Sequence, residues 1–525
     1  MAFTWLIVAT TLLSVAGCAS NQKRPDFRTS ASAFPPLTES GQVDQPERWW
    51  AEFGDPGLNQ QVNKALGESF DLAAALQRLR AAQALTRREA SDLFPDVNGV
   101  IGSSNSFGPG PNQHRINWGL DASYQVDLWG QIQSRVDAER FRAEATREDY
   151  HAVALALAAE VSRTWFALIE SYAQLELLDE QVATNRNGLK AQEARWGSGD
   201  EGGSPDVLRQ RQLVEATLEQ AVVVKARVEV LEHQLAVLTG QPPQTASYSP
   251  GAQLPALPPM PYTGLPSELL KRRPDVRADY LAFVAADRDL ASAITAQYPR
   301  LDLTSSLINS AENPGTLFKD WFYSIGAQLV APLLDGGERR AEVDRRRALL
   351  CQRFNEYGQT MLIALQEVED GLALERYQLE RIERLEAQVG WANKASEQLR
   401  RRYYVGEGSY LDILSASQSQ QRLQREILSA RLDLVLIRIG LYSALAGGFN
   451  PLPEATQLPS DIPQVPSGVE LEQFSPAPEG VEPITVESAG ELFNATEVPA
   501  RNSPAVEPAL ELFINEQRQP KTPRT

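Results

Sequence analysis

Residues 116–127 read INWGLDASYQVD, and apolar and polar side chains alternate along them without a break. The apolar members fall on one face: Ile116, Trp118, Leu120, Ala122, Tyr124 and Val126. A period of two residues indicates a β-strand, whose side chains point alternately to opposite sides. A soluble sheet with one wet face gives the same alternation, so the stretch alone fits a soluble sheet and a membrane barrel equally.

The length of this strand favours a membrane barrel over a soluble sheet. A tilted strand needs roughly 9–11 residues to cross a bilayer, and Trp118 and Tyr124 are of the kind that lies at lipid–water interfaces. A comparable stretch occurs at 321–332. Weaker candidates at 96–107 and 300–310 are expected to be the hairpin partners of the two. We therefore expect four membrane strands per chain.

Four strands cannot close a barrel by themselves. An open sheet in lipid would leave the amides of its edges unpaired, at a cost of several kcal/mol each. A polar inner face also needs a lumen wide enough for water, which eight strands hardly provide and twelve can. We therefore expect a homotrimer whose chains contribute four strands each to a 12-stranded barrel.

Long helices make up most of the remaining chain. Residues 131–195 contain no proline and one glycine, and 338–402 repeat the stretch. A helix of this length is roughly 100 Å long and requires coiled-coil-like packing. One buried stripe recurs at spacings of three and four: Leu157, Val161, Trp165, Leu168, Tyr172, Leu175, Leu178 and Val182. The predicted fold class is mainly α with membrane β; a solitary coiled coil is the alternative, against which the strands argue.

The chain is an internal duplication. Phe94-Pro95 matches Tyr298-Pro299 at an offset of 204, and Glu160-Val161 matches Glu367-Val368 at an offset of 207. The offset changes only where loops are expected, and length changes cost little there. Each copy is therefore expected to hold a helix, two membrane strands and long helices.

Composition divides the chain into six segments. They are a signal peptide at 1–17, a lipidated tether at 18–45, a first repeat at 46–240, a Pro-rich linker at 241–266, a second repeat at 267–450 and an acidic, Pro-rich tail at 451–525. The tail has 13 prolines, 12 acidic and 4 basic residues. It is expected to be disordered.

The N-terminus resembles that of a bacterial lipoprotein. The apolar run 5–16 is too short to span a bilayer but suits a secretory signal. It ends in Val15-Ala16-Gly17-Cys18, which is similar to the lipobox, so Cys18 is expected to carry covalent lipid. Ordinary secretion is the alternative, since no Lys or Arg precedes the run. Ala19 is not the aspartate that retains lipoproteins at the inner membrane, which implies the outer membrane.

Two function classes are disfavoured. A formal net charge of −18 argues against binding to nucleic acid. The three histidines, His114, His151 and His233, are scattered, and no nucleophile triad, phosphate loop or metal-ligand spacing occurs. We therefore expect neither an enzyme nor a metal or organic cofactor.

Several motifs resemble the TolC-like outer-membrane efflux channels, in particular the lipoprotein branch often called NodT- or OprM-like. The likeness covers about residues 46–450. The motifs are Phe53-Gly54-Asp55-Pro56, Asp127-Leu128-Trp129-Gly130, Leu270-Lys271-Arg272-Arg273-Pro274-Asp275-Val276, Pro332-Leu333-Leu334-Asp335-Gly336-Gly337 and Leu441-Tyr442-Ser443-Ala444-Leu445-Ala446-Gly447-Gly448.

The resemblance implies a trimeric channel in the bacterial outer membrane with most of its mass in the periplasm. It implies a 12-stranded barrel, a helical barrel and a mixed equatorial domain. It also implies a periplasmic adaptor and an inner-membrane pump, often of the RND type, as partners in exporting small molecules. The duct of a type I protein secretion system is an alternative. A periplasmic adaptor lipoprotein is a weaker one, because adaptors typically show one hairpin and no duplication.

The resemblance also points to a gate. In the family the turns at 195–208 and 402–414 lie at the periplasmic tip, where channels close and adaptors dock. Leu411, Asp412 and Ser415 of three chains are then expected to form the pore constriction. Asp412 as a plain helix cap is the alternative.

Two positions near the gate depart from the family pattern. Tyr403 matches the family's gate-region tyrosine. Ser415, however, stands where relatives commonly carry an aspartate, and Gly408 stands where the TolC-type gate carries an arginine. These departures argue against a gate closed by that salt bridge.

Overall fold

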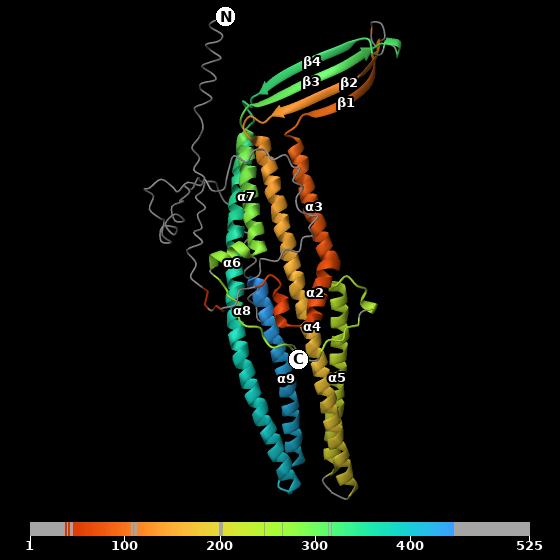
Figure 1. The fold of residues 1–525 in the computed structure, drawn as a ribbon, viewed down its shortest axis with the longest axis vertical. Helices are drawn as coiled ribbons and strands as arrows, with labels where there is room; N and C mark the ends of the chain where they lie inside the picture. The colour runs from red at the N-terminus through yellow and green to blue at the C-terminus, as the bar shows by residue number, and fades with distance from the viewer. Residues whose placement is uncertain are drawn as a thin grey trace, which may run out of the picture. The chain divides into compact units, whose positions relative to one another are not determined.

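The computed structural model describes residues 37–445 except 39, 42–45, 107–108, 110–112, 199–202, 246, 252, 265, 313 and 317. The predicted signal peptide, Cys18 and the tail therefore lie outside the described residues. The elements (Figure 1) are η2 Trp49–Phe53, α2 Pro56–Glu68, α3 Phe70–Ser91, β1 Asp96–Ser106, β2 Gln113–Val126, α4 Gln131–Gly197, α5 Gly203–Leu238, η3 Pro243–Thr245, α6 Pro266–Arg272, α7 Pro274–Thr295, β3 Arg300–Ala311, η4 Pro314–Thr316, β4 Trp321–Val330, α8 Glu338–Tyr404 and α9 Tyr410–Leu445.

The four predicted strands are confirmed and form one antiparallel sheet in the order β1-β2-β3-β4. One register row runs Ile101–Trp118–Asn309–Trp321 across all four. The second hairpin is bonded to the first through β2 and β3, so the two repeats meet in the middle of the sheet. Strands β1 and β4 are left at its edges.

The duplication is visible in the helices. Helices α4 and α8 have 67 residues each, and α5 and α9 have 36 each. The predicted long helices are confirmed. Helices α4 and α8 are each a single uninterrupted helix of about 100 Å. Of the described helices, only α4 has a window apolar and long enough to cross a bilayer. Because 67% of that window is buried within the protein, it is a core segment.

The helices keep the order of the strands. Near the sheet, the main contacts are α3–α4, α4–α7 and α7–α8. Beyond α3 and α7, helices α5 and α9 replace them, and the contacts run α5–α4, α4–α9 and α9–α8. The sheet and these two sets of long helices are therefore each a single row of elements, apart from the short helices that pack on them. Each row has two edges. One edge is formed by β1, α3 and α5, and the other by β4 and α8.

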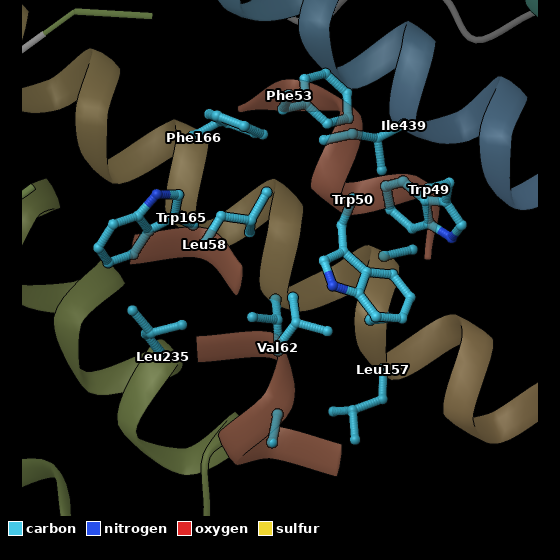
Figure 2. Packing of buried hydrophobic residues seen from close by; sticks show 14 of the residues in the cluster. Trp49, Trp50, Phe53, Leu58, Val62, Leu157, Trp165, Phe166, Leu235 and Ile439 are labelled. Carbon is cyan, nitrogen blue, oxygen red and sulfur yellow. The ribbon is translucent and has the colours of Figure 1, made fainter. Parts of the chain in front are cut away.

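An aromatic core joins η2 to α4 of the first repeat and to α9 of the second (Figure 2). Trp49 and Trp50 are fully buried, and the Trp49 ring stacks on Tyr442 of α9 with centroids 5.7 Å apart. Phe53 packs against Phe166 of α4 at 5.1 Å. Burial of each such ring contributes on the order of 2 kcal/mol. The cluster therefore fixes the short helices at the middle of the long ones.

A short segment before this core also packs on the body. The backbone amide of Thr38 donates to Glu369 of α8 at 2.9 Å, and that of Gly41 donates to the carbonyl of Pro261 at 3.0 Å. Contacts with the body thus begin within the predicted tether at 18–45. This segment holds the linker against α8.

A buried ion pair stabilises the second hairpin where it meets the linker. Arg438 of α9 and Glu375 of α8 are each 2% exposed. Two parallel hydrogen bonds of 2.8 and 2.6 Å join them. The remaining Arg438 nitrogen donates to the carbonyls of Pro258 and Pro259. The pair therefore fixes the proline-rich linker between the repeats.

Candidate functional site

One face of the sheet is apolar over most of its height. Its members alternate along each strand and share register rows: Val97, Ile101, Ile116, Trp118, Leu120, Ala122, Tyr124, Val126, Leu301, Leu303, Leu307, Trp321, Tyr323, Ile325, Ala327 and Leu329. Many of them are exposed in the single chain. Exposed apolar patches of this size mark contact with lipid or protein. The six apolar residues of the predicted strand 116–127 all lie on this face.

Aromatic residues mark the end of the apolar face near the β3–β4 loop. The Trp118 ring lies 4.8 Å from that of Trp321 and 4.9 Å from that of Phe318. Asn309, which is fully buried between them, accepts from the Phe318 amide at 3.3 Å and donates to the carbonyl of Asp320 at 2.7 Å. Asn309 thereby folds the loop back over the apolar face.

The opposite end of the apolar face is bounded by the loops that lead into the long helices. Leu333 and Leu334 are almost fully exposed, and Trp129 is half exposed. The indole nitrogen of Trp129 donates to the carbonyl of Pro299 at 2.7 Å, and its ring lies 5.3 Å from that of Tyr298. Aromatic groups at both ends of an apolar band are typical of outer-membrane strands.

The other face of the sheet is polar apart from one row, Val100–Gly119–Ile308–Phe322. A hollow of about 220 Å³ opens on it, lined by Asn98, Asp121, Ala122, Ser123, Thr304, Ser305, Ser306 and Ser324. The hydroxyls of Ser306 and Ser324 are hydrogen-bonded at 2.8 Å. A sheet with one apolar and one polar face suits a wall between lipid and water.

The turns of the two long hairpins are joined at their tips. Tyr403, near the end of α8, donates to Gln192 of α4 at 3.4 Å, and the Arg195 guanidinium lies 4.6 Å from the Tyr403 ring centroid. Tyr410, at the start of α9, donates to Gln210 of α5 at 2.6 Å. The two tyrosines therefore fasten the second hairpin to the first.

Tyr410 is a neutral donor over the whole physiological range. Burial raises the pKa of its hydroxyl to about 12, and the nearby Tyr403 and Asp206 act in the same direction. Its acceptor is itself fixed, because the Gln210 amide nitrogen donates to the carbonyl of Asn185 at 2.8 Å. The contact is thus a positioned hydrogen bond within a buried network.

Above the tip, α4 and α9 meet through buried amides. Gln174 donates to the carbonyl of Arg425 at 2.9 Å, and Gln181 donates to that of Gln421 at 3.3 Å. Asn185 and Gln421 exchange two bonds of 2.8 and 3.2 Å. Within the second hairpin, an apolar cluster of Leu385, Leu423 and Ala430 packs α8 against α9, and the Gln378 amide donates to the carbonyl of Ala430 at 2.7 Å. The hairpin is therefore a packed unit, and polar bonds fasten it to its neighbour.

The structure does not bring the four predicted gate residues together within one chain. Leu411, Asp412 and Ser415 are exposed on the first turns of α9, whereas Tyr403 packs toward the first hairpin. Asp412 is the third residue of α9 and lies in its first turn. Helix α9 begins at Tyr410, so the hydroxyl of Ser409 takes the cap place and accepts from the Leu411 amide at 3.2 Å.

Sequence reasoning missed the partners of Tyr403, namely Gln192 and Arg195, and the Tyr410–Gln210 bond. A signal was available: Gln174 and Gln181, and then Asn185 and Gln192, recur at spacings of seven along α4. Amides at the buried positions of a coiled coil commonly fix register.

The described residues hold no group of three or more His, Cys, Asp or Glu side chains arranged to bind a metal ion.

The family model described as "Outer membrane efflux protein" matches residues 61–241 and 265–447, more than half of the chain. The chain belongs to the outer membrane efflux protein family. The two matched stretches correspond to its two repeats.

Relatives and a solved structure agree with this assignment. The pyoverdine export outer membrane protein OpmQ of Pseudomonas aeruginosa is 27% identical over 460 residues, covering 83% of this chain and 95% of the relative. The probable outer membrane lipoprotein SilC of Salmonella typhimurium is 25% identical over 465 residues, covering 85% and 98%. The outer-membrane channel OprN superimposes with a TM-score of 0.75 at 27% identity, covering 81% of this chain and 99% of that one.

This efflux protein is therefore an outer-membrane channel of an efflux system in bacteria and not an enzyme. Its fold is the TolC-like one expected from the sequence. The apolar face of its sheet is suited to contact with the outer membrane, and its long helices extend into the periplasm.

Proposed function

We propose that three copies of this efflux protein join edge to edge into one duct. The duct takes small molecules from a periplasmic adaptor and an inner-membrane pump of the RND type and releases them outside the cell. The observation that carries the proposal is that the sheet and the rows of long helices have the same two edges. One edge is formed by β1, α3 and α5, and the other by β4 and α8. Within the described part of the chain, strands β1 and β4 are each paired on one side only. Three copies pair these edges and satisfy all backbone groups in lipid.

The helical edges carry matching apolar stripes. On α5, Val223, Val230 and Val237 recur every seven residues and are exposed. On α8, Tyr377 and Trp391 lie fourteen residues apart and are also exposed. Spacing by sevens is that of a coiled-coil seam. These stripes support a contact between α5 of one copy and α8 of the next.

Replacing Val230 by glutamate is expected to break the trimer. The substitution places a charge in an apolar seam that lies across α5 from the α4 contact. The matched control is Val222→Glu on the same helix, because Val222 is 66% exposed against 62% for Val230 and is turned by about 80° around the helix. Native mass measurement in detergent should find monomers for Val230→Glu and trimers for the control. A wild-type protein that is monomeric would refute the proposal.

The lipid anchor at Cys18 is part of the proposal. The relative SilC is named as a probable outer membrane lipoprotein. The chain between Cys18 and Thr38 is also long enough to reach from the folded body to the membrane. Thr38 is bonded to Glu369, which lies 31 residues, or about 46 Å, along α8 from Glu338 beside the sheet. Twenty residues reach up to ~66 Å. An acyl chain on Cys18 can therefore enter the inner leaflet while the segment at Thr38 stays bound.

Replacing Cys18 by serine is expected to abolish labelling by radioactive palmitate in cells. The protein should remain in the outer membrane, because its strands hold it there. Cys351→Ser is the control and should label as the wild type does, since Cys351 lies half-buried in α8. Labelling that persists in Cys18→Ser would contradict the anchor.

The exposed tip supports both the gate and the partners. Leu411, Asp412 and Ser415 share an exposed face and are proposed to meet their copies at the axis as the constriction. Tyr403 then sets how the second hairpin leans on the first. Exposed apolar residues surround these turns: Trp196, Leu208, Tyr404 and Val405. Such residues at the end of a periplasmic helix bundle suit docking of an adaptor.

A further inference from the structure

Two carboxylates lie on the polar face of the sheet in neighbouring register rows. Asp121 is in the row Asn98–Asp121–Ser306–Ser324. Asp96, at the start of β1, pairs with Ser123 and lies one row nearer the helices. Side chains placed diagonally in this way are about 7–8 Å apart. Both face away from the apolar, lipid-facing surface.

The other charges on this face do not neutralise them. Arg300 pairs with Asp302 at 3.1 Å, so these two cancel. Arg115 lies six residues from Asp121 along β2, about 20 Å away. Among the described residues, neither Asp96 nor Asp121 has a basic partner; Asp96 only accepts from the Asn98 amide at 3.2 Å. Each chain thus carries two uncompensated negative charges at this level.

We propose that Asp96 and Asp121 make the membrane part of the duct selective for cations. The inference rests on the three-chain assembly proposed above, which would place six carboxylates in a belt around the lumen. Rings of aspartate or glutamate attract cations into a pore and repel anions. Small cations and cationic solutes would pass this level more readily than anions of the same size.

The size of the barrel makes the belt effective. Twelve strands about 4.8 Å apart and tilted by ~40° enclose a backbone diameter of ~24 Å. The axis is therefore about 12 Å from the backbone, and less from the carboxylates that project inward. The Debye length is ~10 Å at 0.1 M ionic strength and ~3 Å at 1 M. The belt would act across the whole lumen in dilute salt and lose its effect in concentrated salt.

The test is the reversal potential of the full-length trimer in planar bilayers under a KCl gradient. The wild type should prefer K⁺ over Cl⁻. In an Asp412→Asn background, which removes the carboxylates proposed at the constriction, Asp121→Asn should lower the permeability ratio by about threefold, and Asp96→Asn/Asp121→Asn should bring it close to one. The wild-type ratio should also approach one near 1 M salt, where screening is short-ranged (~3 Å). Asp121→Glu keeps the charge and should keep the selectivity.

Two matched controls separate the belt from other effects. Ser306→Asn adds an amide in the row of Asp121 without changing charge, and Glu312→Gln removes one negative charge from the loop after β3. Both should leave the ratio unchanged. An unchanged ratio in the double variant, or an equal change in Glu312→Gln, would overturn the belt while leaving the duct intact. No conductance from the wild type, or a monomeric wild type, would overturn the duct and the belt together.

Discussion

Replacing Glu375 by alanine is expected to destabilise the folded chain by about 3–5 kcal/mol, because it leaves the buried guanidinium of Arg438 without its counter-charge. Arg438 is 2% exposed and cannot turn to water. Its bonds to the carbonyls of Pro258 and Pro259 would remain, but neutral acceptors do not replace a carboxylate. Denaturant unfolding of the purified protein, followed by the signal of the tryptophan core, measures the loss.

Two further variants show whether burial is the cause. Asp433→Ala breaks an exposed pair, in which Arg381 and Asp433 lie 3.3 Å apart at the surface, and should cost less than about 1 kcal/mol. Glu375→Leu/Arg438→Met removes both buried charges and should recover most of the stability. A loss in Glu375→Ala no larger than that in Asp433→Ala would contradict the argument.

The strands and long helices could be predicted because contact with lipid and with neighbouring helices imposes a period on the sequence. The period of two along 116–127 gave β2, which in the structure begins three residues earlier and ends one residue earlier, and the proline-free stretch 131–195 gave α4. The alternation of β4 is looser for a structural reason. Phe322 lies on the polar face opposite Ile308, so both faces are apolar at that level.

The tip could be predicted only in part, because its bonds join residues far apart in the chain. Tyr410 and Gln210 are 200 residues apart, and no local pattern pairs them. Asp412 lies in the first turn of α9, but the helix begins two residues earlier, and the hydroxyl of Ser409 accepts from an amide of that turn. Spacing identified the helices, whereas the register between them depends on packing.

Removing the hydroxyls of Tyr403 and Tyr410 together is expected to raise the open probability of the channel by about 5–30-fold. The two bonds to Gln192 and Gln210 fasten the second hairpin to the first at the tip. Each hydrogen bond contributes about 0.5–1.5 kcal/mol, with the longer one at the low end, so about 1–2 kcal/mol would be withdrawn from a closed state that keeps both bonds. Single-channel recording of Tyr403→Phe/Tyr410→Phe in planar bilayers measures the change as time spent open.

Two other variants separate the effect of the bonds between the hairpins from the effect of the constriction. Tyr404→Phe removes a neighbouring hydroxyl from a side chain that is 82% exposed, and it should leave gating unchanged. Leu411→Ala should raise the current through each open channel, because it would widen the constriction without releasing the hairpins. If the tyrosine pair changes the current and Leu411→Ala changes the open time, the roles are reversed. If neither variant changes conduction in a trimer that conducts, the constriction lies elsewhere along the duct.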